Sequence, residues 1–228
     1  SAPVGTTMLT CDVTDESSVK ALVDSVLAQT GRIDVVVNNA GLGLFGGAEE
    51  SSIEQIQSLF DVNLFGVHRV TRAFLPLLME SAGRIVMISS DSGFFATPFF
   101  GHYCSSTFAL EGYADSLRRE MLLCGVKVVI IQPGRVATPI WDKGEKMLQG
   151  GGSEPFAGIA RRLGEHAIKK GKSTGLQPVL IARLVQEALT KVKPRLRYLI
   201  APSTLKYRII KLLPAGRVDE MVRKELEK

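Results

Sequence analysis

Short, continuously apolar runs alternate with amphipathic stretches along this chain, and that alternation restricts the fold more than any other feature. The runs lack the in-and-out alternation of a sheet with one wet face, so each predicts a strand covered on both faces. Covered strands separated by helices form parallel sheets through right-handed crossovers. The sequence therefore predicts an α/β fold with a doubly wound parallel sheet. The predicted strands are Thr7–Val13, Asp34–Ala40, Arg84–Ser90, Lys127–Gln132 and Arg197–Ala201.

Helical spacing fills the stretches between these runs. Asp15 is placed to begin the first helix, and Gly31 and Gly125 are placed to end helices. The predicted helices are Ser17–Thr30, Ile53–Ser81, Tyr103–Cys124 and Val179–Val192.

One segment, Trp141–Gly175, interrupts the alternation. It contains the glycine run "QGGG" and the basic run "KKGKSTG", and we expect the basic run at Lys169–Gly175 to be a solvated loop. A phosphate-binding loop is not favoured there, because that motif needs a glycine five residues before Gly171 and this position is His166.

The composition is typical of one soluble globular domain. The 228 residues are 45% hydrophobic and 22% charged, and no apolar run approaches the roughly 20 residues that span a bilayer. The N-terminal stretch has no basic region followed by an apolar one, so we expect no secretory signal. The three cysteines, Cys11, Cys104 and Cys124, lack metal-ligand spacing. We therefore expect free thiols, no metal site and an intracellular, cytoplasmic protein.

The positive charge is concentrated near the C-terminus. Between Lys191 and Arg217 the chain has eight basic and no acidic residues, although its net charge is only +5. Residues 203–228 are therefore predicted to form a basic amphipathic extension. Its apolar residues that are spaced for one helix face are Leu205, Ile209, Leu212 and Leu213. Two interpretations stay open, a helix packed on the domain and a helix on an anionic membrane surface. Nucleic acid is not an expected partner, because no nucleic-acid-binding motif accompanies the charge.

Small and polar residues follow three of the predicted strands. They are "NNAG" at Asn38–Gly41, the pair Ser89-Ser90, and "QPGRVATP" at Gln132–Pro139. In open α/β sheets, ligands bind where loops leave the carboxyl ends of the strands, and small residues let a cofactor approach the backbone. Each cluster alone is ordinary turn chemistry, but three clusters at successive strand ends predict a binding site.

These clusters and their neighbours resemble the short-chain dehydrogenase/reductase family. The matching motifs, in chain order, are "DVTD" (Asp12–Asp15), "NNAG", "DVNLFG" (Asp61–Gly66), "ISS" (Ile88–Ser90), Tyr103 thirteen residues after Ser90, and "PGRVAT" (Pro133–Thr138). The resemblance covers roughly residues 5–202. It implies one Rossmann-like core over residues 1–202, followed by the extension 203–228. The run around Tyr103 is also similar to the branch of steroid and retinol dehydrogenases.

The resemblance implies a chemistry, because members of that family move a hydride between a nicotinamide ring and a carbonyl or alcohol carbon. It implies that Tyr103 is the general acid/base, that Ser90 hydrogen-bonds the carbonyl oxygen, and that Asn63 holds a water of the proton relay. The family's lysine, four residues after the tyrosine, falls at Thr107. A cation about 4 Å from a tyrosine is worth roughly 4 kcal/mol at an effective dielectric of about 20. Its replacement by threonine predicts impaired activity.

The resemblance also implies the ligands and the assembly. The cofactor is expected to be NAD or NADP, and the substrate a small alcohol or carbonyl compound that is apolar and steroid-, retinoid- or lipid-like. Pairing through the two long predicted helices implies a homodimer or homotetramer. The residues implied to bind the cofactor are Asp12, Val13, Asn39, Ala40, Gly41, Pro133, Gly134 and Thr138.

Purely structural interpretations of the same residues stay open. Tyr103 can be a packing residue at a helix start, and Ser90 can simply end a strand. Asn63 can tie a helix to a strand, Asp12 can begin a turn, and Thr138 can cap a helix.

The sequence departs from the family pattern at its beginning as well. The family's Gly-rich turn, which aims backbone amides at the pyrophosphate, is not found before "LTCDVTD". The predicted strand Thr7–Val13 then corresponds to the family's third strand, and we expect the N-terminal strands to be missing from the sheet. A piece of a longer chain is the favoured explanation, and a natural truncation is the other.

Two functions of different classes follow from these observations. The leading one is an NAD(P)-dependent oxidoreductase that interconverts an alcohol and a carbonyl, with impaired activity in this form. The alternative is a catalytically inactive relative that acts as a binding or scaffold protein.

Overall fold

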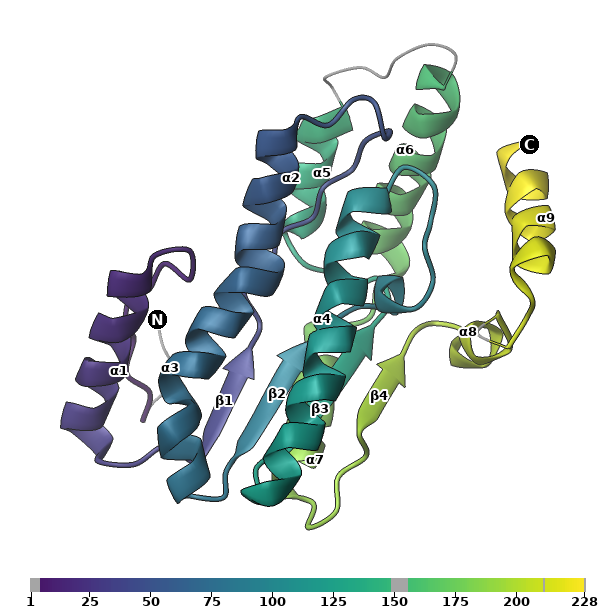
Figure 1. The fold of residues 1–228 in the computed structure, drawn as a ribbon. Coiled ribbons are helices and arrows are strands. Elements are labelled where there is room, and N and C mark those ends of the chain that lie inside the picture. Colours follow the sequence, from purple (N-terminus) through teal and green to yellow (C-terminus); the bar gives the residue numbers. More distant parts are fainter. Residues whose placement is uncertain (1–4, 149–155, 211, 228) are drawn as a thin grey trace.

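The computed structural model describes residues 5–148, 156–210 and 212–227. In these residues four strands form one parallel sheet in the order β1-β2-β3-β4, and helices cover both of its faces (Figure 1). The predicted doubly wound α/β fold is thus confirmed.

The strands are β1 (Val35–Asn38), β2 (Arg84–Ile88), β3 (Lys127–Pro133) and β4 (Arg197–Ile200). The α-helices are α1 (Glu16–Thr30), α2 (Ile53–Phe60), α3 (Val67–Glu80), α4 (Gly101–Glu120), α5 (Ile140–Leu148), α6 (Ala157–Thr174), α7 (Pro178–Thr190), α8 (Thr204–Ile210) and α9 (Ala215–Leu226). Shorter segments are the π-helix η1 (Asp61–Gly66) and the 3₁₀ turns η2 (Asp91–Gly93) and η3 (Met121–Leu123).

Successive residues of the central strands enter two separate apolar cores. In β2, Ile85 and Met87 pack toward α1, α3 and α4, whereas Val86 packs toward α7. The register pairs Ile85 with Val128 and Val86 with Val129, so side chains that enter the same core lie side by side. All of these side chains are buried. This two-sided burial explains why the strands are continuous apolar runs in the sequence.

The predicted strand Thr7–Val13 is wrong. Residues 5–12 make no strand pairing, and Met8 is 79% exposed. A strand needs a hydrogen-bonding neighbour. Among the described residues β1 is an edge strand, on which Val37 is 41% exposed. Because no strand of the described residues lies on the outer side of β1, the apolar residues of Thr7–Val13 have no ladder to join there.

The prediction of a solvated loop at Lys169–Gly175 is also wrong, because α6 continues through Thr174 and α5 lies before it. Small residues dominate the buried side of α6, and glycine is a poor helix former, which hid the helix in the sequence. The buried residues of α6 are Ala160, Gly164, Ile168 and Gly171. The run "QGGG" lies outside the described residues.

The predicted helix boundaries at Asp15, Gly31 and Gly125 are confirmed. The Asp15 carboxylate accepts a hydrogen bond from the backbone N–H of Ser17 and caps α1. Gly31 and Gly125 have φ angles of 65° and 72°, the left-handed conformation that ends helices.

The predicted helix Ile53–Ser81 is confirmed as one helical rod, in which α2, η1 and α3 follow without a break (Figure 1). The π-helical segment in its middle adds residues to a turn, and such segments are frequent at functional sites. It carries Asn63 inward, where the side chain is buried.

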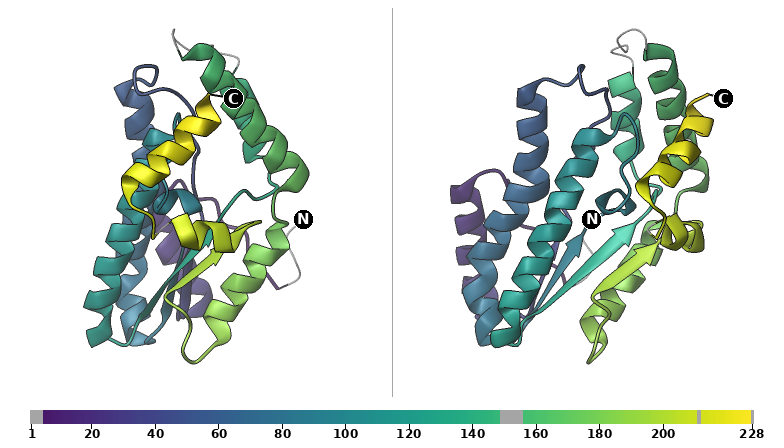
Figure 2. Two further views of the ribbon diagram at one scale, coloured as in Figure 1. Left: turned by 90° about the vertical axis from the view of Figure 1, so that its right-hand side faces the viewer. Right: turned by 45° about the vertical axis from the view of Figure 1, so that its right-hand side comes forward.

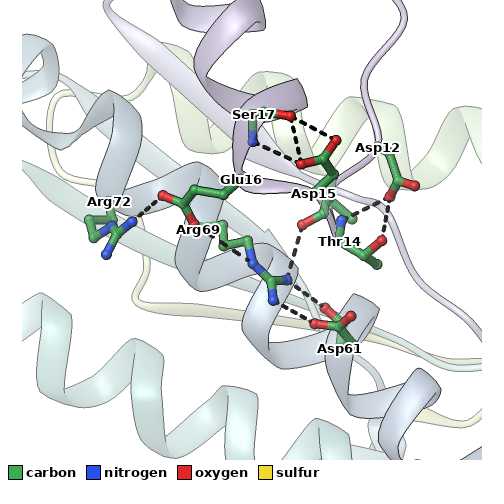
Figure 3. A network of polar contacts seen from close by, with 9 residues as sticks. Asp12, Thr14, Asp15, Glu16, Ser17, Asp61, Arg69 and Arg72 are labelled. Carbon is green, nitrogen blue, oxygen red and sulfur yellow. Dashed lines mark hydrogen bonds and ion pairs between the residues drawn. The ribbon is translucent and has the colours of Figure 1, made fainter.

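A network of charged side chains fastens α1 to this rod (Figure 3). Arg69 of α3 pairs with Asp61 at 2.7 Å and lies 3.9 Å from Glu16, at the start of α1. Arg72 also bonds Glu16. Arg69 further donates to the backbone carbonyl of Val13 at 3.3 Å. The network therefore holds the turn before α1 against η1.

The C-terminal segment consists of two short helices (Figure 2). The prediction that its four apolar residues share one helix face is wrong, because α8 ends at Ile210 and the chain turns before α9 begins at Ala215. Pro214 cannot continue a helix, which explains the turn. The residues concerned are Leu205, Ile209, Leu212 and Leu213.

Helix α9 contacts the rest of the molecule through α6. Arg162 of α6 donates a hydrogen bond to the backbone carbonyl of Leu226 at 2.6 Å. Of the described residues, no helix is both long enough and apolar enough to cross a bilayer.

Two glycine substitutions should change the stability in opposite directions. A Cβ built on Gly66 would lie 2.8 Å from a methyl carbon of Val13 and 3.1 Å from the backbone oxygen of Asp61, so Gly66→Ala should destabilise the fold by about 1–3 kcal/mol. A Cβ on Gly112, inside α4, meets nothing within 4 Å. Gly112→Ala should stabilise by roughly 0.5–1 kcal/mol. Urea denaturation with unchanged slopes measures both. A Gly66→Ala variant that is as stable as the wild type, or more stable, would contradict the close packing of η1 against the turn before α1.

Candidate active site

A large cavity opens at the carboxyl ends of the strands. Its volume is about 1180 Å³, and α4, α5 and α6 contribute to its walls together with the loops that follow β1, β2 and β3. Ten of the residues predicted for the site line this one cavity: Asn39, Ala40, Gly41, Asn63, Ser90, Tyr103, Thr107, Pro133, Gly134 and Thr138. The parallel sheet explains the convergence, because all its strands end at the same edge.

Tyr103 and Ser90 come from different elements and meet in the cavity wall. Ser90 follows β2 and Tyr103 lies in the first turn of α4, and their hydroxyls are hydrogen-bonded to each other. The Phe100 ring stands edge-on to the Tyr103 ring, with centroids 6.5 Å apart. Burial raises the pKa of Tyr103, the Ser90 hydrogen bond opposes this, and the charge of Asp91 adds to the increase. The phenol therefore keeps its proton at neutral pH.

Thr107 supplies no charge at the position one turn further along α4. Its side chain is 4% exposed, and its hydroxyl donates to the backbone carbonyls of Cys104 at 2.9 Å and Tyr103 at 3.1 Å. The groups that act on the Tyr103 pKa are Ser90, Asp91 and Cys104, none of which is a cation. Among the described residues, the pKa of Tyr103 thus lacks the influence that would lower it most.

Asn63 ties three elements together. Its amide accepts from the backbone N–H of Leu42 at 2.8 Å and donates to the carbonyl of the same residue at 2.9 Å. It also donates to the hydroxyl of Ser106 on α4 at 3.1 Å. Ser106 in turn donates to the backbone carbonyl of Tyr103 at 2.8 Å. Asn63 therefore fixes both the loop after β1 and the turn of helix that carries Tyr103.

Small residues line the cavity at the ends of the strands, and at Gly134 a larger side chain would meet its neighbours. A Cβ built on Gly134 would lie 3.0 Å from Cβ of Ala201 and 3.3 Å from Oδ2 of Asp91, and one on Gly41 would face the Asn63 amide at 3.7 Å. The hydroxyl oxygen of Ser89 is buried, lines the cavity and has no hydrogen-bond partner among the described residues. A cradle of small residues with an unsatisfied polar atom fits a flat, polar ring system such as nicotinamide.

Asp12 and Val13 lie away from this cavity. The Asp12 carboxylate accepts hydrogen bonds from the backbone and the hydroxyl of Thr14, at 2.9 and 2.7 Å, in an exposed turn, and these bonds lower the pKa of Asp12 (Figure 3). Val13 packs against Gly66. The structure thus places these two predicted cofactor residues in the turn before α1, apart from the ten other predicted site residues, which line the cavity.

Three cavity residues were not assigned a role from the sequence. Asp91 follows Ser90, Arg135 follows Gly134, and Tyr207 reaches the cavity from α8. Burial raises the pKa of Asp91, whereas its hydrogen bonds with Tyr207 and Ser90 and the charge of Arg135 oppose the increase. Burial and the neighbouring Asp91 raise the pKa of Tyr207 to about 12. The position of Asp91 after the serine pair was visible in the sequence, but nothing there indicated Tyr207.

The outer wall of the cavity is mainly apolar and aromatic. Trp141 of α5 donates its indole N–H to the backbone carbonyl of Val136 at 2.7 Å, which fixes the ring beside the cavity. Helices α5 and α6 stand over the ends of the strands (Figures 1 and 2). The large apolar side chains of this wall include Leu42, Phe45, Phe95, Phe100, Ile140 and Ile168. Such a wall favours an apolar ligand.

Comparison with known proteins places this arrangement in a family. The model of the family "short chain dehydrogenase" matches residues 3–149. The NADPH-dependent 3-dehydrocapnine reductase of Ornithobacterium rhinotracheale is 32% identical over 228 aligned residues, which cover 96% of this chain and 80% of that protein. The 3-ketodihydrosphingosine reductase of Bacteroides thetaiotaomicron is 32% identical over 197 residues, which cover 86% of this chain and 72% of that protein.

A solved structure agrees with the fold. The short-chain dehydrogenase/reductase of Burkholderia phymatum, crystallised in complex with NAD, superposes with a TM-score of 0.74. It is 27% identical, and the superposition covers 88% of this chain and 73% of that one.

Lysine at position 107 should lower the pKa of Tyr103 in the protein without cofactor, because an ammonium group one helical turn away favours the phenolate. Thr107→Met is the matched control, since methionine fills similar space without a charge. NMR titration of isotope-labelled tyrosine measures the pKa, and Tyr103→Phe assigns the resonance. If the lysine and methionine variants titrate alike, position 107 does not tune Tyr103.

Proposed function

The chain belongs to the short-chain dehydrogenase family, and on that premise we propose that it is an NAD(P)-dependent oxidoreductase that reduces the carbonyl of a lipid-like substrate. The observation that carries the proposal is the hydrogen-bonded pair of Tyr103 and Ser90 in the wall of a largely apolar cavity. The pair offers two hydroxyl groups to one carbonyl oxygen.

The cofactor is proposed to lie along the ends of β1, β2 and β3. The residues that would hold it are Asn39, Ala40, Gly41, Pro133, Gly134 and Thr138, which line the cavity. A bound nicotinamide supplies the hydride of the reaction. NADPH-dependence of the Ornithobacterium reductase and the NAD complex of the Burkholderia structure support either form of the cofactor.

Tyr103 is proposed as the general acid and Ser90 as the donor that polarises the carbonyl. When the carbonyl carbon accepts the hydride, Tyr103 gives its proton to the carbonyl oxygen, and an alcohol results. Asn63 acts as a positioning residue, because its bonds to Leu42 and Ser106 hold the surrounding loop and helix. General acid catalysis of this kind contributes about 10²–10⁴ in rate.

The raised pKa of Tyr103 favours the reductive direction. An acid must carry its proton, and the phenol is protonated at every pH below its raised pKa. Oxidation of the alcohol needs the deprotonated form, so that reaction should be slow at neutral pH and accelerate as the pH rises. We therefore propose a reductase whose rate is limited by the neutral Thr107, because a phenolate left after proton transfer is not stabilised by a cation.

The substrate is proposed to be a ketone on a long apolar chain. The aromatic and aliphatic cavity wall supports this proposal. The names of the two reductases that are 32% identical to this chain support it too, since both proteins are named as reductases and one of them is named for a 3-keto compound.

A peripheral contact with membranes through the C-terminal extension stays a prediction. It is supported by exposed apolar side chains on a segment that is rich in basic residues. The exposed apolar residues are Leu205, Ile209, Leu212 and Met221.

Turnover of 3-ketodihydrosphingosine with NADPH or NADH tests the function. We expect loss of reduced-cofactor absorbance in the presence of the ketone, and Tyr103→Phe should lower the rate about 10²–10⁴-fold while the cofactor affinity measured by calorimetry stays unchanged. Tyr113→Phe is the matched control, because Tyr113 lies outside the cavity and faces His68 at 3.3 Å. Absence of both cofactor binding and turnover would contradict the proposal and favour the binding or scaffold alternative.

A homo-oligomer formed through the outer sides of the α2–η1–α3 rod and of α4 is proposed as well. Phe65 of η1 is 52% exposed and Phe108 of α4 is 45% exposed, so both rings are accessible to a second copy of the chain. Phe65→Glu combined with Phe108→Glu should convert a dimer or tetramer into a monomer in light scattering. Leu123→Glu is the control, because Leu123 is more exposed but lies at the end of η3. A wild-type monomer would contradict this assembly.

A further inference from the structure

Helix α8 brings one side chain, Tyr207, back to the cavity from beyond the last strand. Tyr207 hydrogen-bonds the carboxyl group of Asp91. Its ring stands edge-on to Phe94, with centroids 6.2 Å apart. Both Tyr207 and Asp91 line the same cavity as Tyr103 and Ser90. A segment that belongs to the C-terminal extension thus contacts the residue next to the proposed catalytic serine.

Asp91 controls where the proton of Ser90 points. The Ser90 hydroxyl donates to Oδ1 of Asp91 at 3.1 Å and accepts from the backbone N–H of Ser92 at 3.1 Å. A serine hydroxyl has a single proton to donate. While Asp91 holds that proton, Ser90 cannot donate it to a substrate carbonyl.

A protonated Asp91 reverses this arrangement. Its carboxylic acid O–H can donate to Oγ of Ser90, which then has no acceptor in Asp91 and directs its own O–H to the carbonyl oxygen. The exchange reorients two hydroxyl groups and takes one proton from solvent. No other bond forms or breaks, and the substrate proton still comes from Tyr103.

We propose that Asp91 is a positioning residue that switches Ser90 between a withheld and a donating orientation, and that Tyr207 of α8 biases this switch toward the withheld state. The inference rests on the proposed reductase function. It assigns the C-terminal extension a part in the active site.

The groups that face Asp91 act in opposite directions. Burial in the cavity wall raises the pKa of Asp91, whereas the Tyr207 hydroxyl, the Ser90 hydroxyl and the Arg135 cation favour its ionised form. Tyr103 and Cys104 of α4 are also close enough for the charge of Asp91 to raise their pKa values. Because Tyr207 donates to the carboxylate, its removal should raise the pKa of Asp91 further.

The switch is tested by the pH profile of 3-ketodihydrosphingosine reduction with NADPH or NADH. The rate should fall at least about tenfold as the pH rises through the ionisation of Asp91, since losing an oriented donor to an oxyanion typically costs that much or more. Tyr207→Phe keeps the ring and removes the hydroxyl, so it should move the falling limb to higher pH. Tyr113→Phe is the control and should leave the limb in place.

Asp91→Asn gives the second test. Asparagine has the shape of aspartate, does not ionise, and can donate from its amide to Ser90 as a protonated carboxyl would. This variant should keep the high rate of the acid side and lose the falling limb. A limb that persists unchanged in Asp91→Asn, or stays in place in Tyr207→Phe, overturns the inference.

A titration without cofactor or substrate gives an independent readout. Asp91 is one cause of the high pKa of Tyr207, which is about 12. Asp91→Asn should therefore lower the pKa of Tyr207 in NMR titration of isotope-labelled tyrosine, and an unchanged value overturns the contact. If Tyr103→Phe leaves turnover intact, the proposed function fails. If Tyr103→Phe abolishes turnover but Asp91→Asn leaves the pH profile as it was, only the switch fails.

Discussion

Burial of β2 and β3 on both faces is the constraint on which the rest of the structure depends. Their register aligns Ile85 with Val128 in one core and Val86 with Val129 in the other, so helices must cover each side. Crossover connections then run in one direction, and every strand ends at the same edge of the sheet. At that edge the backbone N–H and C=O groups are free of the hydrogen bonds between strands, and the two apolar cores do not extend beyond it. The position of the cavity is thus a consequence of how the sheet buries its apolar residues.

The chemistry of the cavity depends on oriented hydrogen bonds more than on charge. The Thr107 hydroxyl is satisfied by its own helix backbone, and none of the described residues places an ammonium group beside Tyr103 to favour the phenolate. The polar groups around Tyr103 are therefore mainly hydroxyl groups, and each hydroxyl has only one proton to donate. Ser90 is shared between Asp91 and Tyr103, and each partner competes for the same single proton. In such a site, a change in the protonation of Asp91 is enough to redirect the hydroxyl proton of Ser90. In a site with a fixed cation, the same change would have to compete with the electric field of that cation.

The fold and most of the residues that line the cavity were predictable because they follow from periodic or local patterns in the sequence. Two-sided strands are apolar runs, and residues such as Gly41 and Gly134 follow them directly. The remainder depends on tertiary partners. The residues Thr7–Val13 have a strand-like composition but pair with no strand in the part of the chain that the structure describes, so composition alone was misleading. Asp12 is the residue type that the family motif requires, but its carboxylate accepts a hydrogen bond from the backbone N–H of Thr14 in a local turn. Tyr207 lies more than a hundred residues from Asp91 in the chain, and no local pattern connects them.

Helix α6 shows how a residue without a side chain can shape a binding site. A Cβ on Gly171 would lie 2.1 Å from the Trp141 ring, so the ring can rest on the helix backbone only because position 171 is glycine. Lys172, the next residue, pairs with both Asp142 and Glu145 of α5 at 2.8 Å and keeps the two helices together. The basic, glycine-containing run that suggests a loop is therefore the contact that holds the Trp141 wall over the cavity.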